Sequence, residues 1–107
     1  MAKFTIRVVL NGNPSDDDYR KLHRAMRKKG FSNLIYSAKT KKWLRLPHSE
    51  YNRSDEIEKD AVRLAAQNAA STVSHDYQVL VTESSGRTWH NLIVATVDEI
   101  KNEQRSL

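Results

Sequence analysis

Apolar residues alternate with other residues at the start of the chain, in the order Phe4, Ile6, Val8, Leu10. A period of two is typical of a β-strand that buries one face. The next four residues are Asn-Gly-Asn-Pro, and turn residues of this kind end a strand. The sequence therefore predicts a first strand over residues 3–10 with one face in the core.

The pattern then changes to helical spacing. Leu22 and Met26 lie four residues apart, as on the buried side of a helix. Ser15 is suited to cap the start, and three aspartates follow it, where the helix dipole favours negative charge. Gly30 is suited to the position just beyond the end. We expect a helix over residues 15–29.

The middle of the chain predicts a hairpin and a second helix. Residues 34–36 are apolar, and residues 43–46 are apolar apart from Arg45. The two runs flank a lysine-rich turn at 39–42, which favours two paired strands. Residues 48–53 are polar and predict an ordered loop. Residues 55–71 begin with several acids and carry alanines on one face, which favours a helix packed closely on a sheet.

Residues 77–94 contain two runs rich in β-branched residues that flank Ser-Ser-Gly-Arg at 84–87. The glycine allows a tight reversal, so we predict a β-hairpin whose first arm is a central strand. Residues 96–107 are polar and predict a tail that is either a loosely docked helical turn or disordered. A single domain over residues 1–95 is the natural expectation for 107 residues.

The predicted order is strand, helix, strand, strand, helix, strand, with one added strand at the end. That order is the split β-α-β pattern of a ferredoxin-like α+β sandwich. In such a fold an antiparallel sheet carries both helices on one face. We expect this architecture here, with the added C-terminal strand extending the sheet.

Basic residues concentrate in the middle of the chain. Residues 20–53 hold eleven Lys or Arg and one acid, a net charge of +10. Residues 54–107 hold five basic and nine acidic residues, a net of −4, and residues 1–19 hold two and three, a net of −1. The whole chain carries +5, and this asymmetry indicates an anionic partner.

Arginine and lysine follow the polar side of the predicted first helix and the turn of the first hairpin. Like charges four residues apart on a helix repel each other. A helix face that serves only solubility more often carries both positive and negative residues. Two alternatives stay open, a solvated surface and neutralisation by the acidic second helix, and the hairpin lysines can instead protect a sheet edge. An exposed Trp43 or Tyr36 beside them can stack a base. The candidates for binding RNA phosphates are Arg20, Arg24, Arg27, Lys28, Lys39, Lys41, Lys42 and Arg45.

Candidate chemistry is confined to a few polar side chains. The chain has no cysteine, and its four histidines lack zinc-ligand spacing, so we expect no metal site and no cofactor. Cleavage of RNA without a metal needs a base, an acid and a cation on the phosphate. On the predicted last hairpin, Glu83, Arg87 and His90 can supply these roles. His48 with Glu50 is a second candidate pair, and the alternative is that these are surface residues that shape turns.

Three stretches resemble recurring blocks of small bacterial and phage proteins grouped with the GhoS family, the antitoxin of a type V toxin–antitoxin pair. Residues 46–52 read Leu-Pro-His-Ser-Glu-Tyr-Asn, and residues 81–89 read Val-Thr-Glu-Ser-Ser-Gly-Arg-Thr-Trp. Residues 16–31, which begin Asp-Asp-Asp-Tyr-Arg-Lys-Leu-His, fit the same pattern. The resemblance covers roughly residues 3–94.

The resemblance implies a ferredoxin-like fold similar to the CRISPR adaptation nuclease and the VapD proteins. It also implies an RNA-directed role, that of a sequence-specific endoribonuclease that removes a toxin message. Nucleases of the CRISPR type place an aspartate at the end of the first strand, where this chain has Asn11. A neutral amide does not hold a metal as a carboxylate does, which argues against metal-dependent cleavage.

We therefore expect a protein that binds single-stranded RNA, with a homodimer as a further expectation. The N-terminus lacks the apolar run of a signal peptide, and no segment has the apolar length of a membrane span, so we expect a cytoplasmic protein. The alternative is a non-catalytic protein-interaction module that dimerises through a sheet edge.

Overall fold

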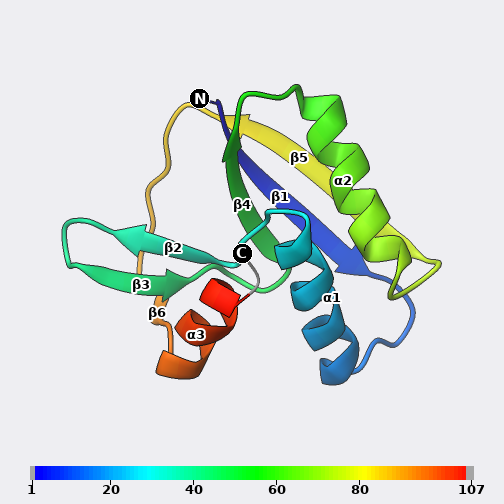
Figure 1. Ribbon diagram of the computed structural model, residues 1–107, viewed down its shortest axis with the longest axis horizontal. Coiled ribbons are helices and arrows are strands. Elements are labelled where there is room, and N and C mark those ends of the chain that lie inside the picture. Colours follow the sequence, from blue (N-terminus) through cyan, green and yellow to red (C-terminus); the bar gives the residue numbers. More distant parts are fainter. Residues whose placement is uncertain (1, 106–107) are drawn as a thin grey trace.

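The computed structural model describes residues 2–105 as a small α+β fold (Figure 1). The described part of the chain contains two antiparallel three-stranded sheets and three helices. None of these helices has the length and apolar character needed to cross a membrane. The elements in chain order are β1 (Ala2–Leu10), α1 (Asp16–Lys28), β2 (Leu34–Ser37), β3 (Lys42–Arg45), β4 (Glu50–Asp55), α2 (Lys59–Ser71), β5 (Tyr77–Ser84), β6 (Ile93–Val94) and α3 (Val97–Arg105).

The strands divide between two sheets rather than forming one. The main sheet has the order β4-β1-β5, with β1 in the centre, and the small sheet has the order β2-β3-β6. A single antiparallel bridge between Ser32 and Asn52 links the chain just before β2 to β4. The side-chain amide of Asn52 also donates to the carbonyls of Ser32 (3.0 Å) and Leu34 (2.8 Å). These bonds fix the small sheet beside the end of α1.

The core lies against one face of β1, as the alternation of its residues predicts. Phe4, Ile6, Val8 and Leu10 are all buried. The same cluster contains Leu22 and Met26 of α1, Tyr51 of β4, and four residues of α2, which are Val62, Ala66, Ala69 and Ala70. Three of these are alanines, so α2 packs on the sheet through small residues as expected, although Ala61, which was expected on the same face, is exposed.

Both ends of α1 have the predicted chemistry. Ser15 and Asp18 form a capping box, in which each side chain accepts a hydrogen bond from the other residue's backbone N–H. Gly30 has φ +88°, and the N–H of Phe31 donates to the carbonyl of Met26 at 3.0 Å, which is a Schellman ending. Phe31 is thereby buried in the core. The orientation of α1 is fixed at both ends, and so is the direction in which its arginines point.

The predicted hairpin over residues 77–94 is wrong. β5 pairs with β1 along eight residue pairs, from Lys3↔Ser84 to Leu10↔Tyr77, and so lies at an edge of the main sheet rather than in its centre. β6 pairs instead with β3. A local turn does form, since Ser84 Oγ accepts from the N–H of Gly86, but the chain beyond it crosses to the small sheet (Figure 1). β1 offers β5 a long ladder with a buried face, and that outweighs a turn signal over four residues.

Two other predicted elements differ from the structure. Residues 48–53 were expected to form a loop, but residues 50–55 form β4, because Tyr51 pairs opposite Ile6 and is buried in the core. A single apolar residue gives no visible alternation, so the strand is hidden in the sequence. The second helix begins at Lys59 rather than near residue 55, because Asp55 instead accepts hydrogen bonds from Arg53.

The C-terminal segment is helical from residue 97 to residue 105, and residues 106–107 of the predicted tail lie outside the described residues. Thr96 and Glu99 form a second capping box, with both reciprocal hydrogen bonds at 3.1 Å. The Thr-x-x-Glu spacing that makes this cap stands in the sequence and predicts a helix start. Of the two alternatives for this segment, the docked helix is the one observed over the described residues.

Candidate functional site

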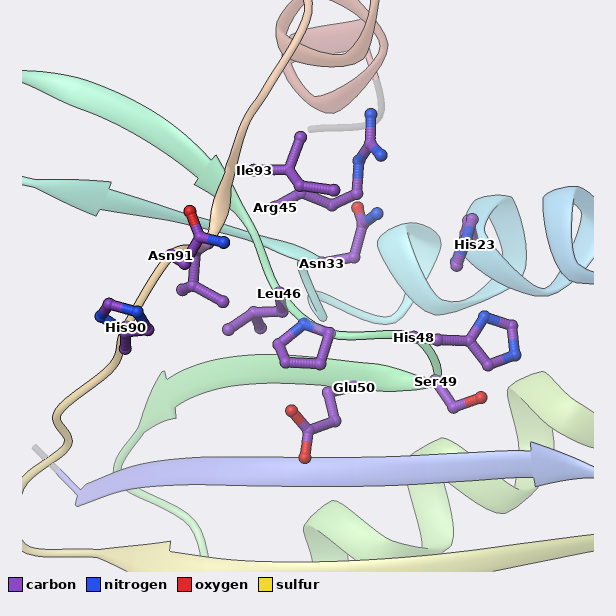
Figure 2. Close-up of a pocket in the computed structure, with 12 residues that line it drawn as sticks. His23, Asn33, Arg45, Leu46, His48, Ser49, Glu50, His90, Asn91 and Ile93 are labelled. Atoms are coloured by element: carbon purple, nitrogen blue, oxygen red, sulfur yellow. The ribbon is translucent and has the colours of Figure 1, made fainter.

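Two neighbouring cavities lie where α1 faces the small sheet. The first, here the histidine cavity, has a volume of about 520 Å³ and is drawn in Figure 2. The second, here the arginine cleft, has a volume of about 470 Å³. His23, Asn33 and Arg45 line both, so the two cavities adjoin. The arginine cleft is completed by Arg20, Arg24, Arg27, Glu99 and Asn102.

The arginine cleft is strongly basic. Arg20, Arg24 and Arg27 follow one another on successive turns of α1, and Arg45 reaches the cleft from β3. Among the described residues, Glu99 is the one acid that lines it. Within residues 2–105, Arg20 and Arg24 form no ion pair or hydrogen bond through their side chains. Two guanidinium groups are therefore free to bind an anion.

Arg45 is already engaged. Its Nε and Nη2 donate to the two carboxylate oxygens of Glu99 at 2.9 and 2.5 Å, a two-pronged pairing. The hydrogen bond from Arg45 is the main reason why the pKa of Glu99 lies below its usual value. Glu99 also caps α3, so one carboxylate both starts the helix and ties it to the small sheet. The available positive charge of the cleft consequently comes from α1.

His23 lies between the two cavities and is neutral. Its Nδ1 is 2.7 Å from the hydroxyl of Tyr51, and the two rings meet edge to face. Burial, and after it the positive charge of Arg27, lowers the pKa of His23 from 6.5 to about 4. Burial likewise raises the pKa of the Tyr51 hydroxyl. The cleft therefore has a neutral imidazole among cationic groups, which can hydrogen-bond a ligand without adding charge.

The depressed pKa of His23 predicts a loss of stability in acid. The unfolded chain takes up a proton on His23 near pH 6.5, whereas the folded chain does so only near pH 4. The contribution is therefore complete above pH 6.5 and is lost as the pH falls towards 4. We expect the free energy of unfolding to fall by about 3 kcal/mol over this interval.

Urea denaturation across this pH range measures the effect, and His23→Gln is the matched variant because an amide can still bond Tyr51 but does not titrate. The variant should show a shallower dependence on pH, because it lacks the imidazole whose pKa burial lowers in the folded chain. Equal slopes for the two proteins would contradict the assignment of the loss to His23.

The histidine cavity carries the second predicted pair, His48 and Glu50, together with His90. The ring of His48 packs against Tyr19 with 4.4 Å between the ring centroids. Figure 2 shows His48 and His90 at opposite ends of the cavity, with Leu46 between them. The two imidazoles are therefore not arranged as an acid and a base on one phosphate.

Ser49, which also lines the histidine cavity, has an unusual conformation. Its φ is +69°, a region that L-residues rarely adopt, and it is buried. Its Oγ has no hydrogen-bond partner among the described residues. A strained backbone and an unpaired buried hydroxyl are both costly, and such costs cluster at functional sites.

The trio predicted for catalysis lies in three separate places. Glu83 lines a shallow cavity at the start of β1, Arg87 lines a cavity beside the β2–β3 turn, and His90 lines the histidine cavity. Their grouping depended on a hairpin between β5 and β6 that the structure does not contain.

The residues predicted to bind phosphates divide into two groups. Arg20, Arg24, Arg27 and Arg45 meet in the arginine cleft. Lys28 lies towards α2 in another cavity, and Lys39 lines the cavity beside the β2–β3 turn. Lys41 and Lys42 lie at the turn end of the hairpin, which points away from α1 (Figure 1).

The predicted neutralisation of α1 by α2 does not apply to Arg20 or Arg24. Asp60 of α2 pairs within its own helix with Arg63 at 3.9 Å, and Lys21 of α1 pairs with Asp17 at 3.5 Å. The acid that enters the cleft comes from α3, as Glu99.

Sequence reasoning missed four residues of the arginine cleft. His23 lies one turn from Arg20 on the helix, a spacing from which its presence there could have been inferred. Asn33, Glu99 and Asn102 reach the cleft only through the docking of α3 and the small sheet, for which the sequence has no local signal.

No group of three or more His, Asp or Glu side chains within residues 2–105 is arranged to hold a metal ion. Comparisons of the chain with protein-family models, with curated proteins and with solved structures find no match. The chemistry of the two cavities therefore carries the functional argument.

Proposed function

We propose that this protein binds single-stranded RNA, with the arginine cleft holding the phosphates. The observation that carries the proposal is the pair of unengaged guanidinium groups, Arg20 and Arg24, in a cleft that Arg27 and Arg45 also line. Guanidinium groups bind phosphate oxygens through paired, charge-assisted hydrogen bonds. A cavity of about 470 Å³ has room for a phosphate and its sugar rather than for a duplex.

The neighbouring histidine cavity favours RNA as the ligand. It presents the amides of Asn33 and Asn91 and the neutral imidazole of His23, together with four apolar side chains and one acid, Glu50. Such groups hydrogen-bond the edges of unpaired bases and the 2′-hydroxyl, which distinguishes RNA from DNA. An RNA strand that passes from the arginine cleft into the histidine cavity would place its phosphates beside the arginines. It would place a base beside the neutral amides and imidazole.

We further propose a GhoS-like protein with a modified ferredoxin-like fold. The order β4-β1-β5, with α1 and α2 packed in the core against β1, agrees with the split β-α-β arrangement. In a ferredoxin-like sheet, the fourth strand would pair along β4. Here β2 and β3 belong to the small sheet instead, and the Ser32–Asn52 bridge lies where that pairing would begin. Binding is the part of this role that the geometry supports best, because His48 and His90 lie apart.

Fluorescence anisotropy with a labelled pool of short single-stranded RNA tests the proposal. With two phosphate contacts, from Arg20 and Arg24, we expect the affinity to fall about sevenfold between about 50 and 200 mM salt. No binding at low salt, or binding that salt does not change, would overturn it. The same samples, incubated with a chelator and analysed for products, show whether cleavage accompanies binding.

A second candidate function is an interaction module that dimerises through a sheet edge. The outer edge of β5 has no strand partner among the described residues, and Leu80 on this strand is 64% exposed. Unpaired strand edges are templates for another chain. Sedimentation that reveals a dimer insensitive to salt, together with no RNA binding, would favour this function.

A further inference from the structure

The chain exposes three aromatic side chains that lie close together in space. Tyr36 of β2 is 51% exposed, and Trp43 and Trp89 are 37% and 44% exposed. These include both tryptophans of the protein. Large aromatic rings are costly to leave in water, and exposed ones often mark binding surfaces.

Tyr36 and Trp89 line one cavity of about 360 Å³, here the aromatic cavity. Lys39 and Arg87 line it as well, and no acid does. Neither of these two cations forms an ion pair with a residue in the described part of the chain. The cavity therefore combines aromatic surface with unneutralised positive charge.

Trp43 supports this arrangement from the neighbouring strand. It pairs directly opposite Tyr36, and the two rings meet edge to face with 5.3 Å between their centroids. Such a contact restrains the Tyr36 ring without covering its exposed surface. A restrained ring loses less conformational entropy when a flat ligand stacks on it.

We propose that the aromatic cavity binds a nucleobase, with Lys39 and Arg87 on the adjoining phosphate. Bases of single-stranded RNA stack on tyrosine and tryptophan, and basic groups follow the backbone. The volume lies near the lower end of the range for small-ligand sites, roughly 300–1,000 Å³, which suits one nucleotide. The neutral polar side chains that line the cavity are the hydroxyls of Ser37, Thr40 and Thr88. A hydroxyl can both donate and accept a hydrogen bond, so we expect little preference among bases.

The aromatic cavity connects with the cleft along the chain. Residues 87–89 line the aromatic cavity, residues 90–93 line the histidine cavity, and the histidine cavity adjoins the arginine cleft. One RNA strand can thus occupy the aromatic cavity, the histidine cavity and the arginine cleft, one after the other. The inference rests on the proposed function, and the experiment separates the two.

The probes are a short oligoadenylate and an abasic ribose-phosphate strand of the same length and charge. We expect the wild-type protein to bind oligoadenylate more tightly than the abasic strand. Trp89→Ala should weaken oligoadenylate binding about tenfold and leave abasic binding unchanged, because one base loses its stacking partner. Trp89→Phe keeps a ring and should restore most of the affinity.

Leu64→Ala, at an exposed apolar residue of α2, is the matched control and should change neither affinity. Equal affinities of the wild-type protein for both strands would overturn the base subsite while leaving phosphate binding intact. Equal losses for both strands in Trp89→Ala would also overturn it, because the tryptophan would then act on backbone contacts. If neither strand binds at low salt, the subsite and the proposed function both fail.

Discussion

Replacement of both Arg20 and Arg24 by glutamate should weaken the binding of single-stranded RNA by at least about 100-fold. Each arginine has a free guanidinium group in the arginine cleft, and each substitution removes one charge-assisted contact and adds a repulsive carboxylate. The salt dependence of the residual binding should be shallower, because fewer phosphates are neutralised. Fluorescence anisotropy over a series of salt concentrations measures both quantities.

The matched control reverses two basic residues with the same spacing on α2, as Lys59→Glu with Arg63→Glu. It changes the net charge by the same amount but leaves the cleft intact, so we expect a loss of at most about threefold from long-range repulsion. Far-UV circular dichroism should show both variants folded. If the two double variants lost affinity equally, net charge rather than the cleft would govern binding.

Tyr51→Ala should lower the free energy of unfolding by about 4 kcal/mol. Tyr51 is the largest of the fully buried side chains, packed in the core with β1 and α1. Its removal leaves a cavity that the well-packed surroundings fill only in part. Because small domains are stable by only about 5–15 kcal/mol, much of the protein would be unfolded at moderate temperature. Urea denaturation of the full chain measures the loss.

Tyr51→Phe separates the ring from its hydroxyl. This variant keeps the buried volume but leaves the Nδ1 of His23 without its partner at 2.7 Å, and we expect a loss of about 1–2 kcal/mol. A loss for Tyr51→Ala no larger than that for Tyr51→Phe would show that packing around this residue contributes little. The two variants together separate the contribution of the Tyr51 ring to the free energy of unfolding from that of its hydroxyl.

The sequence predicts those elements whose signals are local. β1 alternates over its whole length, and α1 has a cap, a buried stripe and a glycine ending, so both are found to within one residue at each end. β4 has one core residue, Tyr51, and its existence depends on pairing with β1. The partners of β5 and β6 follow from competition among strands, which a turn at residues 84–87 does not reveal.

The residues of the candidate site also differ in whether a local sequence signal predicts them. The arginines of α1 share a face because of helical periodicity, and that face is visible in the sequence. The residues opposite them come from β3 and α3, whose docking depends on the Arg45–Glu99 pair, 54 residues apart in the chain. The acid in the cleft and the neutral state of His23 are consequences of this docking and of burial.

Ser49 combines two local costs that a glycine would remove. Glycine at this position would relieve the strain of φ +69° and would remove a buried hydroxyl that has no partner among the described residues. The serine lies in the wall of the histidine cavity, so both local costs fall at the candidate site.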